Sequence, residues 1–136
     1  MLVELLKVGD TAQRDIVVTP EMTAEALGNA GATVLATPIL VQYLELVSID
    51  ALAPAVKPGE MSLGIAIDVQ HLAATPVGGA VHLRAEVTEI NGRKVSFSVS
   101  ASDDVELVAT ATHDRFVVNT EKFFQGVDAK RQKLGL

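Results

Sequence analysis

Residues 37–53, which read TPILVQYLELVSIDALA, are apolar at most positions and predict a helix. Thr37 and Pro38 mark its start, because a threonine hydroxyl can cap a free backbone N–H and proline suits the first helical turn. A helix that is apolar on almost every side is normally buried. Polar residues interrupt it at a spacing of three, so they follow one line along the helix, and the middle one is Glu45. We therefore expect a carboxylate on a largely buried helix, where it needs a partner.

A membrane-spanning role is not expected for this helix. A spanning helix needs about 20 nearly uninterrupted apolar residues. The stretch is shorter than this and contains Gln42, Glu45 and Asp50. It is predicted to be the central helix of a soluble domain.

Strand-like alternation fills most of the remaining chain. A first strand is expected at residues 11–19. The segment 20–35 begins with helix-like PEMTAEAL and ends in GNAGAT, which has the composition of a flexible linker. Four strand-like stretches follow the helix as a predicted meander: residues 61–73, 79–90, 93–102 and 105–118. The polar end, residues 119–136, is expected to be partly helical.

Each strand-like stretch has one apolar face. The first stretch places on that face Leu63, Ile65, Ile67, Val69 and His71; the second Val81, Leu83, Ala85 and Val87; the third Val95, Phe97, Val99 and Ala101; the fourth Leu107, Ala109, Ala111, His113 and Arg115. The dipeptide Asn91-Gly92 predicts a tight hairpin, and Asp103-Asp104 a turn. His82 lies on a polar face and is expected at the surface.

These elements predict an α+β fold in one domain, residues 1–136, with an antiparallel sheet wrapped around a single central helix. One helix covers only part of such a sheet, and the free strand edges also need protection. A symmetric homodimer, or a higher oligomer, would provide both.

The composition of the chain limits which classes of binding partner and chemistry are expected. The net charge of −6 argues against nucleic-acid binding. Lys130, Arg131 and Lys133 are a candidate patch for an anionic ligand, although a solvated tail is the better explanation of them. The chain has no cysteine, which excludes a disulfide framework and a thiolate nucleophile. Its start, MLVELLKVGD, does not resemble a signal peptide, so a cytoplasmic location is expected.

Three polar side chains are candidates for chemistry. His71 lies on the strand face that packs against the helix bearing Glu45, and a carboxylate beside an imidazole fixes its orientation. Thr37 lies two helical turns before Glu45, about 80° around the helix. A hydroxyl, a carboxylate and an imidazole at one pocket suit acyl-transfer hydrolysis, through a positioned water or a nucleophilic hydroxyl. A core role for His71 and plain helix capping by Thr37 are the alternatives, and a metal site lacks a third ligand.

Three segments resemble the fluoroacetyl-CoA thioesterase branch of the hot-dog fold thioesterases: VLATPILVQYLELVSIDALAP, PGEMSLGIAIDVQHLAATPVG and ATHDRFVVNTEKF. The resemblance covers roughly residues 7–133, and SLGxxIxVxHLAATPxG is its most specific part. It implies a usually dimeric hot-dog fold that hydrolyses an acyl-CoA thioester, with Thr37, Glu45 and His71 as the catalytic set. It also implies substrate contacts at Gly64 and Arg115. Coenzyme A would enter only as part of the substrate, with no cofactor or metal.

One departure from that branch concerns the acyl group. The fluoroacetyl-specific enzyme has a phenylalanine-bearing lid before the threonine, whereas this chain has GNAGATVLA there. A different or broader acyl specificity is therefore expected. The alternative function is a non-catalytic acyl-CoA binding module, since fold alone does not fix function. A hot-dog dehydratase is disfavoured because the chain lacks an Asp-x-Asn-Pro-x-His pattern.

Overall fold

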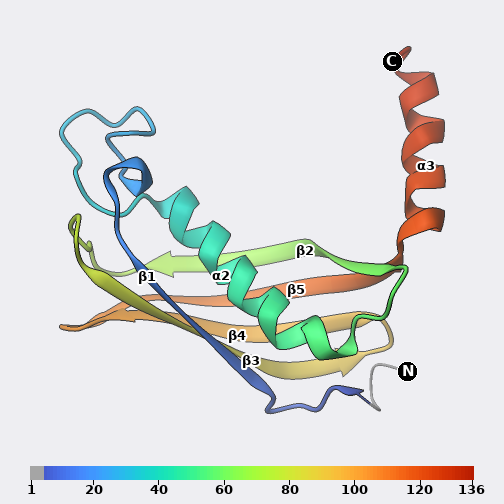
Figure 1. Cartoon of the computed structure of the whole chain (residues 1–136), viewed down its shortest axis with the longest axis horizontal. Coiled ribbons are helices and arrows are strands. Elements are labelled where there is room, and N and C mark those ends of the chain that lie inside the picture. The colour runs from blue at the N-terminus through green and yellow to red at the C-terminus, as the bar shows by residue number, and fades with distance from the viewer. Residues whose placement is uncertain (1–4) are drawn as a thin grey trace.

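Five antiparallel strands form one sheet, and helix α2 lies across one of its faces (Figure 1). The computed structural model describes residues 5–136; residues 1–4, the start of the predicted N-terminal lead, lie outside the described part. The elements are β1 (Thr11–Val17), η1 (Pro20–Met22), α2 (Thr37–Leu52), η2 (Ala53–Ala55), β2 (Glu60–His71), β3 (Ala80–Asn91), β4 (Lys94–Asp103), β5 (Leu107–Asn119) and α3 (Thr120–Lys133). The predicted α+β arrangement of a sheet and one central helix is confirmed.

The strand order is β1-β3-β4-β5-β2, which corrects the predicted four-strand meander. Strands β3, β4 and β5 are consecutive neighbours, joined by the predicted tight turns after Asn91 and Asp103. β2 pairs with β5 instead of β3, because β1 occupies the other side of β3. Strand β2 therefore forms one edge of the sheet, and on its outer side no strand of the described chain pairs with it.

Helix α2 supplies much of the core. Leu40, Leu44 and Val47 are fully buried, and the helix packs chiefly on β3 and β1. Burying one such side chain contributes roughly 1.5–3 kcal/mol. Contrary to the sequence estimate, the segment Thr37–Ala55 does pass as a membrane span by length and composition. A core helix passes the same test, and packing on the sheet accounts for its apolar character.

A β-bulge divides β2 into two halves. Its register against β5 shifts between Gly64 and Ala66, so Ile65 is an extra residue. One extra residue moves all preceding side chains to the opposite face. The prediction of strict alternation from Leu63 to His71 is therefore wrong. After the bulge, Ile67 and Val69 pack against the core as predicted. Before it, Gly64 faces the helix in place of Leu63, and Ile65 itself is 55% exposed.

A second register shift, near the start of β5, changes which residue there faces the core. It lies opposite Ala101 and Ser102 of β4, and it buries Val108 while leaving Leu107 45% exposed. His113 and Arg115 are buried as predicted. The predicted inward faces of β3 and β4 are also confirmed, as their eight apolar residues are all buried.

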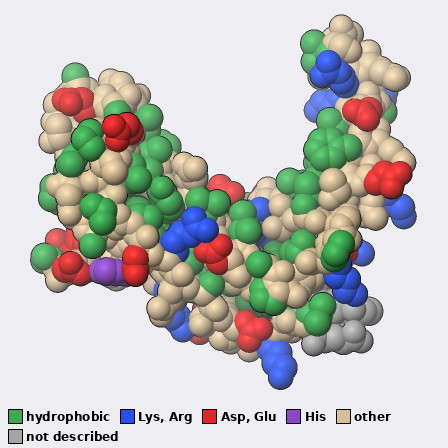
Figure 2. Space-filling model, viewed as in Figure 1, with side chains coloured by type: hydrophobic (Ala, Val, Ile, Leu, Met, Phe, Trp, Pro, Cys, Tyr) green, Lys and Arg blue, Asp and Glu red, His purple; other side chains and the backbone are tan. Residues whose placement is uncertain are grey.

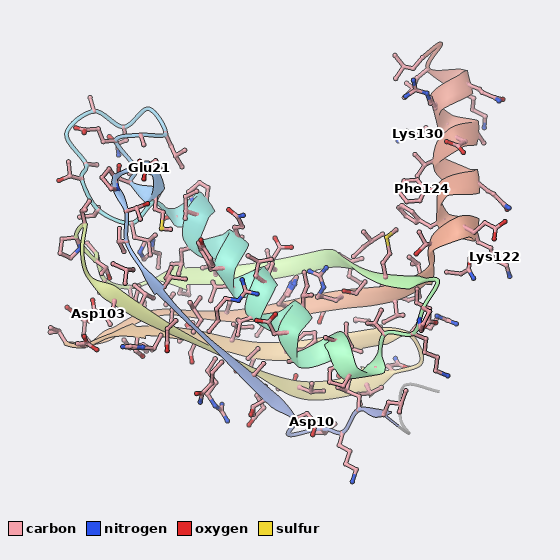
Figure 3. The ribbon with its side chains drawn as sticks, viewed as in Figure 1. Asp10, Glu21, Asp103, Lys122, Phe124 and Lys130 are labelled. Atoms are coloured by element: carbon pink, nitrogen blue, oxygen red, sulfur yellow. The ribbon has the colours of Figure 1, made fainter. Side chains whose placement is uncertain are left out.

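The molecule projects upward in the view at both of its ends, above strand β2 (Figures 1 and 2). At one end, the segment 18–36 contains the short 3-10 turn η1 in place of the predicted helix, followed by turns and isolated β-bridges. At the other end, α3 is more helical than expected and projects from the body with Lys122, Phe124 and Lys130 exposed along it (Figure 3). Figure 2 shows a hollow between these two ends.

Candidate active site

The start of α2 meets the end of β2 through Thr37 and His71. The Oγ1 atom of Thr37 lies 2.7 Å from Nδ1 of His71. Thr37 is the first helical residue and Ala36 is the N-cap, and no side chain caps the helix. The predicted capping role of Thr37 is thus wrong, since a side chain at this position is already inside the helix. The Thr37 hydroxyl can therefore hydrogen-bond to the imidazole of His71.

The other ring nitrogen of His71 has no partner in the described chain. Its Nε2 atom is buried and makes no hydrogen bond. Buried polar atoms in folded proteins nearly always have a partner, so an exception asks for an explanation. If the Thr37 hydroxyl donates to Nδ1, then Nε2 carries the proton and needs an acceptor.

Farther along the same helix, Glu45 belongs to a second cluster. Its Oε2 atom lies 3.4 Å from Nη1 of Arg115, whose side chain is only 5% exposed. Arg115 also donates from Nε to the Ser62 hydroxyl at 2.9 Å and from Nη2 to the Ser62 carbonyl at 3.0 Å. The guanidinium is thereby fixed between strand β2 and helix α2.

His113 completes this second cluster. Its Nδ1 lies 2.8 Å from the carbonyl oxygen of Ala66, and its Nε2 lies 3.2 Å from Nη1 of Arg115. Burial lowers the pKa of His113, and the charge of Arg115 lowers it further. Burial also lowers the pKa of Arg115, which Glu45 partly offsets; an arginine nevertheless stays protonated at neutral pH.

Gly64 lies under this cluster, where a side chain would be crowded. A Cβ atom there would be 3.0 Å from Oε2 of Glu45, 3.2 Å from His113 and 3.3 Å from Arg115. The close approach of backbone and carboxylate thus favours glycine. An open pocket adjoins it at the free edge of the sheet, lined by Glu45, Gly64, Ile65, Ala66, Ile67 and His113.

The predicted site residues therefore fall into two groups within one chain. Thr37 contacts His71, whereas Glu45 contacts Arg115 above Gly64. In residues 5–136 no hydrogen bond or ion pair joins the groups. Eight residues of helix separate Thr37 from Glu45, about 12 Å, and Gly64 and His71 are roughly 20 Å apart along β2. The expected contact between Glu45 and His71 is not made inside the chain.

Sequence reasoning missed the parts played by Ser62 and His113. The alternation of β5 placed His113 inward, but its partners depend on the bulge in β2, which the alternation did not reveal. His82 is on the outer face, as predicted, with its ring nitrogens 2.8 Å from Asp15 and 2.8 Å from Asp104.

Comparisons with known proteins identify the family of the chain. Residues 18–121 match the family described as fluoroacetyl-CoA-specific thioesterase. The fluoroacetyl-CoA thioesterase of Streptantibioticus cattleyicolor is 40% identical over an alignment of 124 residues, and the match covers 87% of this chain and 89% of that protein.

Solved structures show the same fold. A structure of the fluoroacetyl-CoA thioesterase FlK is 39% identical, covers 92% of this chain and 97% of its own, and superposes with a TM-score of 0.86. A thioesterase superfamily member from Thermus thermophilus is 26% identical over 96% of each chain, with a TM-score of 0.89. A hot-dog-like protein from Thermanaerovibrio acidaminovorans, 24% identical over 93% of this chain and 94% of its own, has a TM-score of 0.87. The chain therefore belongs to the fluoroacetyl-CoA-specific thioesterase family, a hot-dog family of thioester hydrolases.

Proposed function

We propose that this protein hydrolyses small, uncharged acyl-CoA thioesters to a free acid and coenzyme A. The observation that carries the proposal is the 2.7 Å contact between Thr37 and His71, beside a buried ring nitrogen that has no partner. Family membership supports the reaction class. Structures of FlK variants have been solved with acetyl-CoA and with fluoroacetate and CoA, which supports a CoA thioester as substrate.

His71 is the proton carrier in this proposal. It takes a proton from the Thr37 hydroxyl, or from a water held there, and the oxygen so activated attacks the thioester carbonyl carbon. The carbon–sulfur bond then breaks, and the thiolate of coenzyme A receives the proton from His71. If the threonine oxygen attacks, a water repeats the cycle on the acyl-threonine ester. Backbone N–H groups at the start of α2 or near Gly64 would stabilise the oxyanion.

The charges of the pocket favour an acyl group without a carboxylate. Glu45 lines the pocket, and its negative charge opposes a second one. Arg115 is engaged by Ser62, His113 and Glu45, so its positive charge is already matched. The absence of an aromatic residue in 18–36 further favours a broader range of neutral acyl groups than fluoroacetyl.

A homodimer is part of the proposal. Strand β2 is an open edge, and open edges recruit further strands. A second copy can pair antiparallel along β2 about a two-fold axis, which would extend the sheet across both chains. Exposed Ile65 on this strand would then be near the interface.

Antiparallel pairing also offers His71 its missing partner. If the axis passes through Asp68, Ile67 faces the partner's Val69 and Ala66 faces the partner's Gln70. The extra residue Ile65 of the bulge then brings His71 opposite the partner's Gly64. Directly opposite residues share a sheet face and have Cβ atoms about 4.5–5.5 Å apart. Since Glu45 lies above Gly64 in each chain, the partner's Glu45 would accept a hydrogen bond from Nε2 of His71. Each site would then combine Thr37 and His71 from one copy with Glu45 from the other.

The function is tested by free-thiol release from a panel of acyl-CoAs: acetyl, fluoroacetyl, branched, aromatic and malonyl. Wild type and His71→Ala are measured in parallel. We expect cleavage of neutral acyl groups by wild type, little cleavage of malonyl-CoA, and loss in the variant. If wild type cleaves none but acyl-CoA raises its melting temperature, the protein is a binding module and the proposal fails.

The shared site is tested by co-expressing two inactive variants, His71→Ala and Glu45→Gln, with different tags. If sites are shared, half of the dimers are mixed and each contains one intact site, giving about a quarter of wild-type activity. Co-expression of His71→Ala with Thr37→Ala is the matched control, because both residues come from the same copy and no intact site can form. Equal inactivity of the two mixtures would contradict the shared site.

A further inference from the structure

His113 connects three features of the second cluster: the bulge in β2, Arg115 and Glu45. It is 2% exposed and stacks at a ring-centroid distance of 6.2 Å from Phe97 in the core. Both of its ring nitrogens have partners, Ala66 and Arg115.

The two partners determine the proton position on His113. The carbonyl oxygen of Ala66 can only accept, so Nδ1 must carry a hydrogen. The guanidinium of Arg115 can only donate, so Nε2 must present a lone pair. His113 is therefore a neutral imidazole protonated on Nδ1. The low pKa that burial imposes on it agrees with this state.

Arg115 is consequently held by fixed acceptors. Its Nε and Nη2 atoms donate to Ser62, and Nη1 donates to His113 and, over 3.4 Å, to Glu45. Its contacts occupy four of the five N–H groups of a guanidinium, which leaves little capacity for a substrate anion. The predicted direct substrate role of Arg115 is thus less suited to the structure than a supporting one.

The carboxylate of Glu45 depends on this support. Its side chain is 39% exposed and Arg115 is its only hydrogen-bonding partner in residues 5–136. The contact of 3.4 Å is already long for a hydrogen bond, so a small movement of the guanidinium away from Glu45 would lose it. A displacement of about 1 Å at a catalytic group can cost on the order of a hundredfold in rate.

We propose that His113 is a positioning residue, whose Nδ1-protonated ring anchors Arg115 and through it fixes the Glu45 carboxylate above Gly64. The inference rests on the proposed thioesterase function for its kinetic consequence alone. It adds no proton-transfer step, because the proton on Nδ1 is retained by the Ala66 carbonyl.

The variants that test it are His113→Phe and His113→Gln. Phenylalanine keeps the ring volume against Phe97 but removes both hydrogen bonds. Glutamine places a carboxamide oxygen near the position of Nε2 and so keeps an acceptor for Arg115. We expect kcat of His113→Phe to fall roughly tenfold to a hundredfold with little change in KM, and His113→Gln to recover part of the loss. A buried residue with a purely packing role would give the reverse order, because phenylalanine preserves the packing better.

A second measurement does not depend on activity. Long-range ¹H–¹⁵N spectra of the wild-type imidazoles at neutral pH should show one ring protonated on Nδ1 alone, absent in His113→Gln. The Nε–H resonance of Arg115 should exchange slowly in wild type and quickly in His113→Phe. A charged ring, or one protonated on Nε2, would overturn the inference even in an active enzyme.

The two readouts separate the proposals. If wild type cleaves no thioester while the spectra show the expected ring and the slow Arg115 resonance, the thioesterase function fails and the anchoring of Arg115 stands. If wild type is active and kcat of His113→Phe is unchanged, the positioning role fails. His82→Gln is the matched control, because this histidine lies on the outer face and should leave both kcat and the Arg115 resonance unchanged.

Discussion

His71 and His82 lie on opposite faces of the same sheet and have opposite surroundings. His71, on the helix side, has a hydroxyl on one ring nitrogen and nothing in the described chain on the other. His82, on the outer face, has a carboxylate on each nitrogen. In the second arrangement two carboxylates favour the protonated ring; in the first, Nδ1 lies beside a hydroxyl from which it can take a proton.

The difference shows how environment decides which histidine can do chemistry. Hydrogen bonds to Asp104 and Asp15 raise the pKa of His82, which favours the charged form of its ring and occupies both nitrogens. A proton carrier must be able to release and regain a proton during each cycle. The geometry at His71 permits this, and four measurements test or sharpen the contrast.

The largest effect is expected for His71→Ala against His82→Ala. Loss of a general acid–base group costs roughly 10²–10⁴ in rate, so thiol release should fall at least about a hundredfold in the first variant. The second should retain wild-type turnover. Equal kcat values in folded samples of His71→Ala and wild type would contradict the proposed role.

A smaller loss is expected at Thr37. Thr37→Val removes the hydroxyl while keeping the branched shape, and should lower kcat by roughly tenfold to a hundredfold. Thr37→Ser keeps the hydroxyl and should retain most activity. Parallel kinetics decide between the roles: a valine variant as active as the serine variant would show that the hydroxyl near His71 is dispensable.

Gly64→Ala should act on the second cluster with a more modest result. The new methyl group meets Glu45, His113 and Arg115 at 3.0–3.3 Å, and overpacking of this kind costs about 1–3 kcal/mol. Chemical denaturation should report that loss, together with lower kcat. Gly126→Ala, on exposed α3 with nothing within 4 Å, is the matched control and should leave both quantities undiminished.

The smallest effect concerns pH and His82. Its raised pKa means that the folded state binds the proton more tightly than the unfolded chain, whose value is about 6.5. The resulting stability is fully present below that pH and is lost as pH rises through the folded pKa. The melting temperature of wild type should exceed that of His82→Gln most at about pH 6 and least at about pH 9. A constant difference across this range would exclude the titration of His82 as its cause.

Much of the framework was predictable because it depends on local patterns. The apolar run of α2, the alternation of β3 and β4, and the Asn91-Gly92 turn each specify an element through nearby residues. The contact between Thr37 and His71 was also foreseen, as part of a larger convergence. Glu45 was predicted to join the same contact, but within the chain its partner is Arg115. Nothing in the apolar and polar pattern indicated that partner.

The remaining features depend on distant pairing. Nothing in Leu63 to His71 distinguishes a continuous strand from one with a bulge, because Ile65 suits both faces. The bulge exists only relative to β5, as does the position of β2 at the sheet edge. The partners of His113 depend on that register, so the alternation of apolar and polar residues could not predict them.

The bulge at Ile65 has a consequence for how such a strand can change during evolution. Loss of the single Ile65 codon would remove the bulge and leave β2 as one continuous strand. Gly64 would still lie opposite Arg115 and Ala66 opposite Asp114, so Gly64 would keep its place under Glu45. If the Gly64 codon were lost instead, Ile65 would take the position opposite Arg115, and the carboxylate of Glu45 would meet a branched side chain. A deletion of Ile65 is therefore expected to be tolerated far better than a deletion of Gly64.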